Sequence, residues 1–307
     1  MKKYHYYKVY GLNVKSDIEI SELLPIEDVE ENRIDIKIIK GIIQKEVIDS
    51  IPSYSWFKYD VKNMVFTVEN VGSFYIYDGK NIIVQPSENA DKQMVKTFIL
   101  GTSFGMILSQ RNKVAIHGGS ILIGEKAIVL TGQSGAGKST LTNAFRHYEY
   151  PFIADDVSST IEFQDEIFVE PAYPQQKICR DAMEKMGYNI EDFRLIDEGR
   201  EKYVIPAHKS FIKEKRKLEA IFKIEPYDGE EVKIEEVLGG NKMKIILSNI
   251  YRIELIAPHG IPPIYFKKVI NIAKKVLVYR IKRPRDQFSV DKQIELIEKE
   301  LKLKCNS

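Results

Sequence analysis

Residues 127–140 read Ala-Ile-Val-Leu-Thr-Gly-Gln-Ser-Gly-Ala-Gly-Lys-Ser-Thr. The first five form a nearly uninterrupted apolar run, which is typical of a strand buried on both faces. The next eight match the pattern G-x-x-x-x-G-K-[ST] in full, and a helix-compatible stretch follows them. We therefore predict a buried strand, a glycine-rich loop and a helix in this order, which is an arrangement that binds phosphate groups.

The residue types in this loop suit phosphate chemistry. Glycine tolerates positive φ and lets backbone N–H groups approach phosphate oxygens, and the following helix N-terminus adds partial positive charge. Lys138 would reach the β- and γ-phosphates, and the Ser139 hydroxyl would ligate Mg²⁺. The predicted phosphate site comprises Gly132, Gln133, Ser134, Gly135, Ala136, Gly137, Lys138, Ser139 and Thr140. The alternative is a glycine-rich turn that binds nothing, and the loop alone does not separate switches, motor ATPases and kinases.

Two adjacent carboxylates follow a second apolar strand, Phe152-Ile153-Ala154. If this strand lies parallel beside the loop strand, Asp155 and Asp156 end near the bound phosphates. One acid there is expected as a Mg²⁺ ligand, and phosphoryl transfer to a hydroxyl also needs a carboxylate that takes the proton. The alternative is a turn with solvated carboxylates.

A histidine precedes the loop in Ile116-His117-Gly118-Gly119, which the pattern places at the junction of two strands. A lone histidine in apolar surroundings is more often structural than catalytic. The two glycines behind it indicate a close approach of the backbone to a neighbouring segment.

The chain changes character near residue 90. Before it, short stretches alternate apolar and polar residues, and Asp78-Gly79 marks a hairpin, so we predict a β-rich lobe over residues 1–90. Residues 91–111 have helical spacing, and strands and amphipathic helices follow, so residues 91–307 are predicted to form an α/β catalytic domain with the phosphate loop.

Composition excludes collagen-like, low-complexity and wholly disordered proteins. The chain has 307 residues, 44% of them hydrophobic, and a formal charge of +2, which calls for neither a nucleic acid nor a membrane partner. Two distant cysteines, Cys179 and Cys305, form no zinc or disulfide framework. With no apolar run typical of a signal peptide or membrane span, we expect a cytoplasmic protein. The sequence leaves open whether it is a homo-oligomer.

Taken together, His117-Gly118, the loop from Gly132 to Ser139 and the pair Asp155-Asp156 resemble the C-terminal domain of bacterial HPr kinase/phosphorylase and the shorter HPr-kinase-like serine kinases. The later Tyr173-Pro174-x-x-Lys177 is similar to a segment of these relatives. The resemblance implies a P-loop kinase core like that of phosphoenolpyruvate carboxykinase, which uses ATP or another nucleoside triphosphate with Mg²⁺ to phosphorylate a serine of a peptide or protein. It also implies that Asp155 is the base, that Asp156 and Ser139 hold Mg²⁺, and that His117 contacts Asp155.

The sequence departs from HPr kinase in one region. That enzyme has a further glycine-rich signature, linked to phosphorolysis, and residues 218–226 have no counterpart of it. The N-terminal lobe, with Tyr10-Gly11-Leu12 and Ser73-Phe74-Tyr75, is similar instead to that of stand-alone kinases of lasso-peptide precursors, which implies a C-terminal serine as acceptor. Two alternatives stay open: an HPr serine kinase of carbon regulation, and a nucleotide-dependent regulatory module that transfers nothing.

Several basic residues are candidates for contacts with the nucleotide or acceptor, although each is also compatible with a solvated surface charge. Lys177 is the preferred candidate because it follows Tyr173-Pro174. The full set is Lys177, Arg180, Arg200, Lys202, Arg283 and Arg285.

Overall fold

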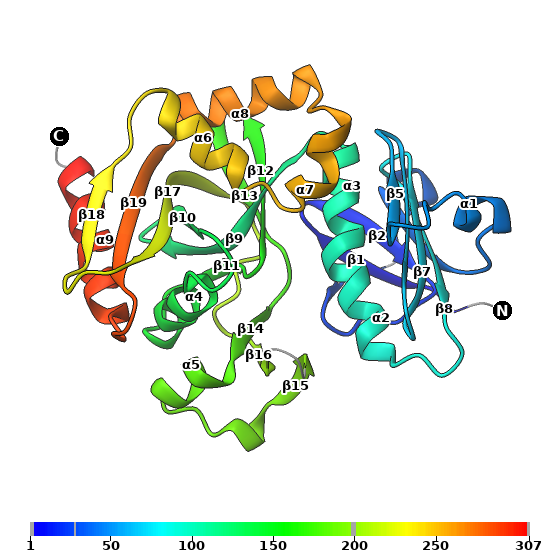
Figure 1. Ribbon diagram of the computed structural model, residues 1–307, viewed down its shortest axis with the longest axis horizontal. Coiled ribbons are helices and arrows are strands. Elements are labelled where there is room, and N and C mark those ends of the chain that lie inside the picture. Colours follow the sequence, from blue (N-terminus) through cyan, green and yellow to red (C-terminus); the bar gives the residue numbers. More distant parts are fainter. Residues whose placement is uncertain (1–2, 28, 198–200, 306–307) are drawn as a thin grey trace. The chain divides into compact units, whose positions relative to one another are not determined.

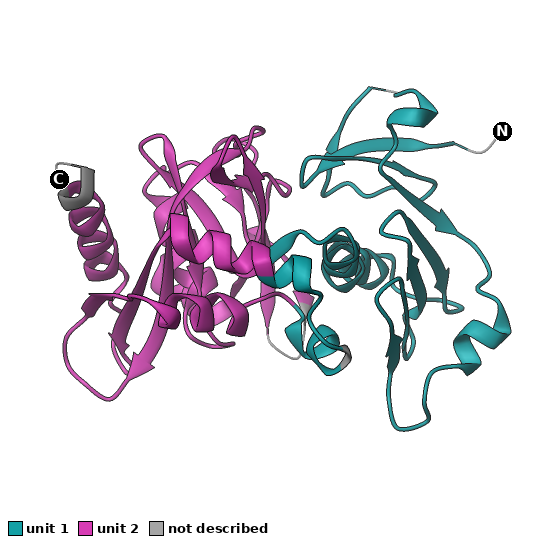
Figure 2. Ribbon diagram, turned by 90° about the horizontal axis from the view of Figure 1, so that it is seen from above, with its two compact units in different colours: residues 1–115, 252–266 teal, residues 116–251, 267–307 magenta. Residues whose placement is uncertain are grey.

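The computed structural model describes residues 3–27, 29–197 and 201–305. It is a mixed α/β structure in which the described strands form two sheets of eight strands and one of three. The chain makes two compact units (Figure 2): residues 1–115 with 252–266, and residues 116–251 with 267–307. None of the described helices combines the length and apolar character needed to cross a membrane.

The first unit is built on an eight-stranded sheet in the order β3-β1-β2-β4-β8-β7-β6-β5. Figure 1 labels β1, β2, β5, β7 and β8 of this sheet. Its strands are β1 (His5–Val9), β2 (Leu12–Ser16), β3 (Leu24–Pro25), β4 (Ile36–Lys40), β5 (Phe57–Tyr59), β6 (Asn63–Val68), β7 (Gly72–Tyr77) and β8 (Asn81–Pro86). The predicted hairpin is confirmed, because β7 and β8 pair antiparallel and both Asp78 and Gly79 have positive φ, 55° and 60°. Two short helices, η1 (Glu31–Arg33) and α1 (Lys45–Asp49), lie in the connections.

A nearly continuous helix covers this sheet, formed by α2 (Lys92–Phe98), the π-helical turn η2 (Ile99–Ser103) and α3 (Phe104–Gln110). Phe98 packs against Phe66 of β6 and Phe74 of β7, with ring centroids 6.1 and 5.9 Å away. Because this helix buries its apolar side on the first sheet, residues 91–115 belong to the first compact unit, whereas the sequence assigned them to the catalytic domain. The segments α7 (Ile253–Ile256) and η4 (Ala257–His259) also belong to the first unit.

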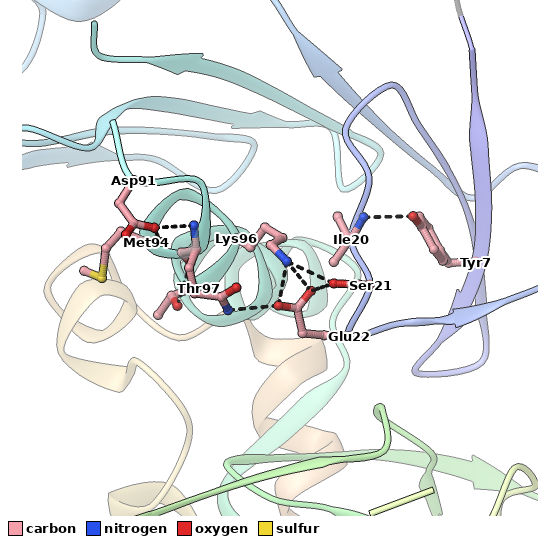
Figure 3. A network of polar contacts seen from close by, with 9 residues as sticks. Tyr7, Ile20, Ser21, Glu22, Asp91, Met94, Lys96 and Thr97 are labelled. Atoms are coloured by element: carbon pink, nitrogen blue, oxygen red, sulfur yellow. Dashed lines mark hydrogen bonds and ion pairs between the residues drawn. The ribbon is translucent and has the colours of Figure 1, made fainter. Parts of the chain in front are cut away.

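A buried carboxylate ties α2 to the loop before β3 (Figure 3). Glu22, only 8% exposed, accepts hydrogen bonds from Lys96 Nζ at 2.8 Å and Gln93 Nε2 at 2.9 Å. Burial opposes ionisation of Glu22, but these hydrogen bonds outweigh it and lower the pKa of its carboxyl. Asp91 caps the same helix by accepting from the backbone N–H groups of Gln93 and Met94.

The second unit contains an eight-stranded sheet whose pairings close a ring through β10, β9, β12, β13 and β17, with β19 and β18 extending from β17 and β11 pairing with β9. Its strands are β9 (Val114–Ile123), β10 (Lys126–Thr131), β11 (Phe152–Ala154), β12 (Val157–Phe163), β13 (Glu166–Glu170), β17 (Arg216–Tyr227), β18 (Lys233–Glu236) and β19 (Leu277–Pro284). Its helices include α4 (Lys138–His147), α6 (Gly240–Ser248), α8 (Pro263–Lys275) and α9 (Val290–Cys305). The strand and helix predicted on either side of the glycine-rich loop are therefore present, as β10 and α4.

A small three-stranded sheet, β14 (Gln175–Cys179), β16 (Lys202–Pro206) and β15 (Arg194–Asp197), lies in the same unit together with α5 (Arg180–Lys185) and η3 (Ile190–Asp192). Its own apolar cluster includes Ile178, Met183 and Tyr203. The sheet meets α4, since Asn143 donates a hydrogen bond to Gln176 of β14 at 3.2 Å. This contact places β14 beside the helix that follows the loop.

The strand before the acidic pair does not lie beside the loop strand, which corrects the sequence-based expectation. The parallel neighbour of β10 is β17, and β11 pairs with β9 instead. Because β9 runs antiparallel to both β10 and β11, these two strands still point the same way. Their carboxyl ends, Thr131 and Ala154, therefore reach the same edge of the sheet.

Candidate active site

The glycine-rich loop leaves β10 through a backbone conformation that requires glycine. Gly132, Gly135 and Gly137 have φ values of 145°, 80° and 101°. A Cβ atom on Gly132 would lie 2.5 Å from the carbonyl oxygen of Ile224 on β17, so a larger residue would push the loop off the sheet. Gly137 is the N-cap of α4, and Lys138, Ser139 and Thr140 form the first turn of that helix.

Lys138 curls back over the loop. Its Nζ donates hydrogen bonds to the carbonyl oxygens of Gly132 at 2.9 Å and Gln133 at 3.0 Å. Burial lowers the pKa of this lysine, while the negative charges of Asp156 and Asp155 act in the opposite direction. The ammonium group, the loop and both carboxylates therefore lie within electrostatic reach of one another.

Arg283, at the end of β19, holds the loop from the other side. Its Nε donates to the carbonyl oxygen of Ala136 at 2.8 Å, and Nη2 lies 3.5 Å from that of Gly135. Burial lowers the pKa of Arg283, and the charge of Arg285 adds to this effect. The sequence analysis included Arg283 among residues compatible with surface charges; no local pattern connects it with a loop 147 residues away.

The two carboxylates of the acidic pair have different surroundings. Asp155 Oδ2 accepts a hydrogen bond from the backbone N–H of Lys177 at 2.9 Å, whereas its Oδ1 is buried and has no hydrogen-bond partner among the described residues. Burial, reinforced by the charge of Asp156, raises the pKa of Asp155 to about 7. Asp155 thus has one oxygen fixed by a backbone N–H and one buried oxygen that no described residue satisfies with a hydrogen bond.

His117 contacts Asp156, which corrects the expected contact with Asp155. Its Nε2 lies 3.2 Å from Oδ1 of Asp156. Burial alone would raise the pKa of Asp156, but the hydrogen bond and charge of His117 overcome it and hold that pKa well below its usual range. The backbone sets the partner, because the N–H of Gly118 donates to the carbonyl oxygen of Asp156 at 3.0 Å and brings the two residues together.

The histidine lies inside one strand and not at a junction of two, because β9 runs without a break from Val114 to Ile123. Gly118 and Gly119 keep the ladder with β10 by pairing with Thr131 and Leu130. A Cβ on Gly118 would lie 2.2 Å from the carbonyl oxygen of Leu130, and one on Gly119 would lie 2.4 Å from Thr142 Oγ1. The close approach inferred from these glycines is therefore present.

His117 is held on several sides. Its backbone N–H donates to Asn249 at 2.7 Å, and its carbonyl oxygen accepts from Thr131 Oγ1 at 2.8 Å. Its ring makes a T-shaped contact with that of Tyr251, with centroids 5.6 Å apart. These contacts restrict the orientation of the imidazole toward the acidic pair.

Two lysines from the small sheet face the acidic pair. In the β14–β16 ladder Lys177 pairs with Val204 and Cys179 with Lys202, so Lys177 and Lys202 occupy the same face. The positive charges of both lower the pKa of Asp155 and of Asp156. Lys202 therefore lies beside Lys177 near the acidic pair; the sequence analysis named both lysines as candidates and preferred Lys177.

The other basic candidates lie differently. Arg180 pairs with Glu201 at 2.9 Å and donates to Tyr203 at 2.8 Å, whereas Arg285 pairs with Asp228 at 3.1 Å. Arg200 falls outside the described residues. The structure thus brings Lys138, His117 and the two aspartates together at one sheet edge. Lys177 and Lys202 of the small sheet face the aspartates, whereas Arg180 forms an ion pair at the end of the small sheet.

No family model and no curated protein matches the chain. Among solved structures, the HPr(Ser) kinase/phosphatase from Coxiella burnetii is similar at 12% sequence identity and a TM-score of 0.33, over 63% of this chain and 99% of that one.

Proposed function

We propose that this protein is a kinase that transfers the γ-phosphoryl group of ATP, or of another nucleoside triphosphate, to a serine hydroxyl of a peptide or protein. The observation that carries the proposal is the buried, unpartnered Oδ1 of Asp155, at the sheet edge where the glycine-rich loop and Lys138 also lie. A nucleotide switch needs no such proton acceptor. The proposal includes a P-loop kinase core of the HPr kinase and phosphoenolpyruvate carboxykinase type, with a β-rich N-terminal lobe.

The proposed reaction is an in-line transfer. The serine oxygen forms a bond to the γ-phosphorus, the bond from that phosphorus to the β,γ-bridging oxygen breaks, and the nucleoside diphosphate leaves with the bond's electron pair. The serine proton passes to Oδ1 of Asp155, whose raised pKa suits a proton acceptor near neutral pH. The loop N–H groups and Lys138 stabilise the charge on the phosphoryl oxygens.

The residues present fit a Mg²⁺ ion bound together with phosphate oxygens. Asp156, kept ionised by His117, and the Ser139 hydroxyl would be its protein ligands. The described residues include no group of three or more His, Cys, Asp or Glu that could hold a metal by itself, and Mg²⁺ in such sites takes few protein ligands. When bound, the ion would neutralise charge that develops on the β- and γ-phosphates.

The acceptor is proposed to be the C-terminal serine of a lasso-peptide precursor, following the resemblance of the N-terminal lobe. The two lysines beside the acidic pair, Lys177 and Lys202, are available to attract a carboxylate or phosphate at this point of the site. Two alternatives are that the acceptor is the HPr phosphocarrier and that the protein has a regulatory role without transfer. A phosphoryl-transfer assay distinguishes them.

The test is transfer of labelled γ-phosphate with Mg²⁺ to three acceptors: HPr, a lasso-precursor peptide ending in serine, and the same peptide ending in alanine. We expect label on the serine-ended peptide alone. Asp155→Asn should abolish transfer while nucleotide affinity changes by no more than a few-fold, and Asp165→Asn, at an exposed turn, is the control. Label on HPr alone would identify HPr, and not the peptide, as the acceptor. Nucleotide binding without any transfer would support the regulatory module.

A further inference from the structure

A cavity of about 370 Å³ lies against the phosphate loop in the second unit. Gly137 and Thr140 form one wall, α5 contributes Lys185, and the segment after β19 supplies Asp286, Gln287 and Phe288. Its volume lies within the ordinary range for small-molecule sites. Because the wall is shared with the loop, a ligand whose phosphates occupy the loop can continue directly into the cavity.

The cavity lies away from the proposed acceptor. None of His117, Lys138, Asp155 and Asp156 is among its lining residues. A hydroxyl that is to lose its proton to Asp155 must approach from the side of the acidic pair. The cavity is therefore placed to receive the other end of the triphosphate, which carries the nucleoside.

The chemistry of the lining suits an aromatic base joined to an anion. Phe288 is 44% exposed although it is a large apolar residue, and Lys185 Nζ lies 5.9 Å from the centre of its ring. Asp286 and Gln287 offer hydrogen-bond acceptors and donors beside this ring, and Arg283 and Arg285 add positive charge to the lining. An exposed aromatic ring next to such polar groups can stack a nucleobase.

We propose that this cavity binds the nucleoside part of the triphosphate, with the base stacked on Phe288; the inference rests on the proposed function of the loop. Arg283 and Phe288 belong to one short segment of the chain. Arg283 donates to the carbonyl oxygen of Ala136 and approaches that of Gly135. The residue proposed to stack the base is therefore close in the chain to the one that holds the loop. Recognition of the base is thereby coupled to the shape of the phosphate loop.

The experiment compares ATP with inorganic tripolyphosphate, which has the phosphates without the nucleoside, by calorimetry on the full chain. We expect the wild type to bind ATP more tightly than tripolyphosphate. Phe288→Ala should weaken ATP binding about tenfold and leave tripolyphosphate binding unchanged. The matched control is Phe163→Ala, because Phe163 is 43% exposed and also has a lysine, Lys215, over its ring.

Phe288→Trp provides a second measurement that does not depend on the tolerance of the site to alanine. The chain has a single tryptophan, Trp56, which lies in the first unit. We expect ATP, but not tripolyphosphate, to quench the fluorescence of the added tryptophan.

Two results would overturn the proposal: an unchanged ATP affinity in Phe288→Ala, or an equal fluorescence response of Phe288→Trp to both ligands. Nucleoside-dependent binding with no phosphoryl transfer would support the cavity assignment and overturn the kinase; failure of the wild type to bind either ligand would overturn both.

Discussion

The imidazole of His117 contacts Asp156 and not Asp155: its Nε2 lies 3.2 Å from Oδ1 of Asp156. The histidine therefore supports the carboxylate that we assign to Mg²⁺, and it leaves Oδ1 of the proposed base without a partner among the described residues. Two adjacent, chemically identical side chains thus have different surroundings, because one is held by an imidazole and the other by a backbone N–H.

Replacing His117 should raise the Mg²⁺ requirement. In His117→Ala the hydrogen bond that keeps Asp156 ionised and oriented is lost, so the apparent affinity for Mg²⁺ in the transfer reaction should fall about tenfold. Rates measured against Mg²⁺ concentration, at saturating nucleotide, give this quantity. His208→Ala, at an exposed histidine of the same unit, is the control. A loss of rate that is equal at every Mg²⁺ concentration would contradict the assignment and point to an effect through Asp155.

Arg283→Met should loosen the glycine-rich loop. The variant removes the donor that holds the carbonyl oxygen of Ala136, so affinity for tripolyphosphate and for ATP should fall together, by about tenfold. Calorimetry on both ligands checks this. Arg280→Met, on the same strand but paired with Glu225 and Glu235, should leave both affinities unchanged. If Arg283→Met binds tripolyphosphate as the wild type does, the loop does not depend on this arginine.

Gly118→Ala should destabilise the second unit. The added Cβ would lie 2.2 Å from the carbonyl oxygen of Leu130, which belongs to the strand before the loop and cannot move aside cheaply. We expect a loss of about 1–3 kcal/mol in the free energy of unfolding, measured by denaturant titration. A Cβ on Gly240, at the start of α6, meets no atom within 4 Å, so Gly240→Ala should be neutral or slightly stabilising. Equal stability of the two variants would contradict the close approach of β9 to β10.

Glu22 should make the stability of the first unit depend on pH. Its pKa is lower in the folded protein, so folding favours the ionised carboxylate. The stabilisation is fully present above the ordinary carboxyl pKa of 4.5 and is lost as pH falls through the lowered value. The difference in unfolding midpoint between wild type and Glu22→Gln should therefore shrink as the solution is acidified from pH 6 toward pH 3.

Fluorescence of Trp56 follows this unfolding within the first unit. Glu27→Gln alters an exposed carboxylate a few residues away and serves as the control, with a midpoint close to wild type throughout. A difference between wild type and Glu22→Gln that stays constant down to pH 3 would show that the contacts with Lys96 and Gln93 do not depend on the charge of Glu22.

Local patterns in the sequence predicted the parts of the site that depend on consecutive residues. The apolar run before Gly132, the glycines of the loop and the helical stretch after Lys138 were enough to predict β10, the loop and α4, because backbone preference acts over a few residues. The hairpin at Asp78-Gly79 was predictable for the same reason. The glycines after His117 also indicated a close approach, although not the segment approached.

Tertiary structure alone decided which segments meet. The pairing of β11 with β9, the contact of His117 with Asp156 and the hydrogen bond from Arg283 to Ala136 join residues whose proximity depends on how strands are sorted within the sheet. A local pattern records whether a residue suits a strand, a turn or a helix, but it holds no information about a partner 147 residues away. The loop could therefore be found from the sequence, whereas the surroundings that distinguish Asp155 from Asp156 required the folded chain.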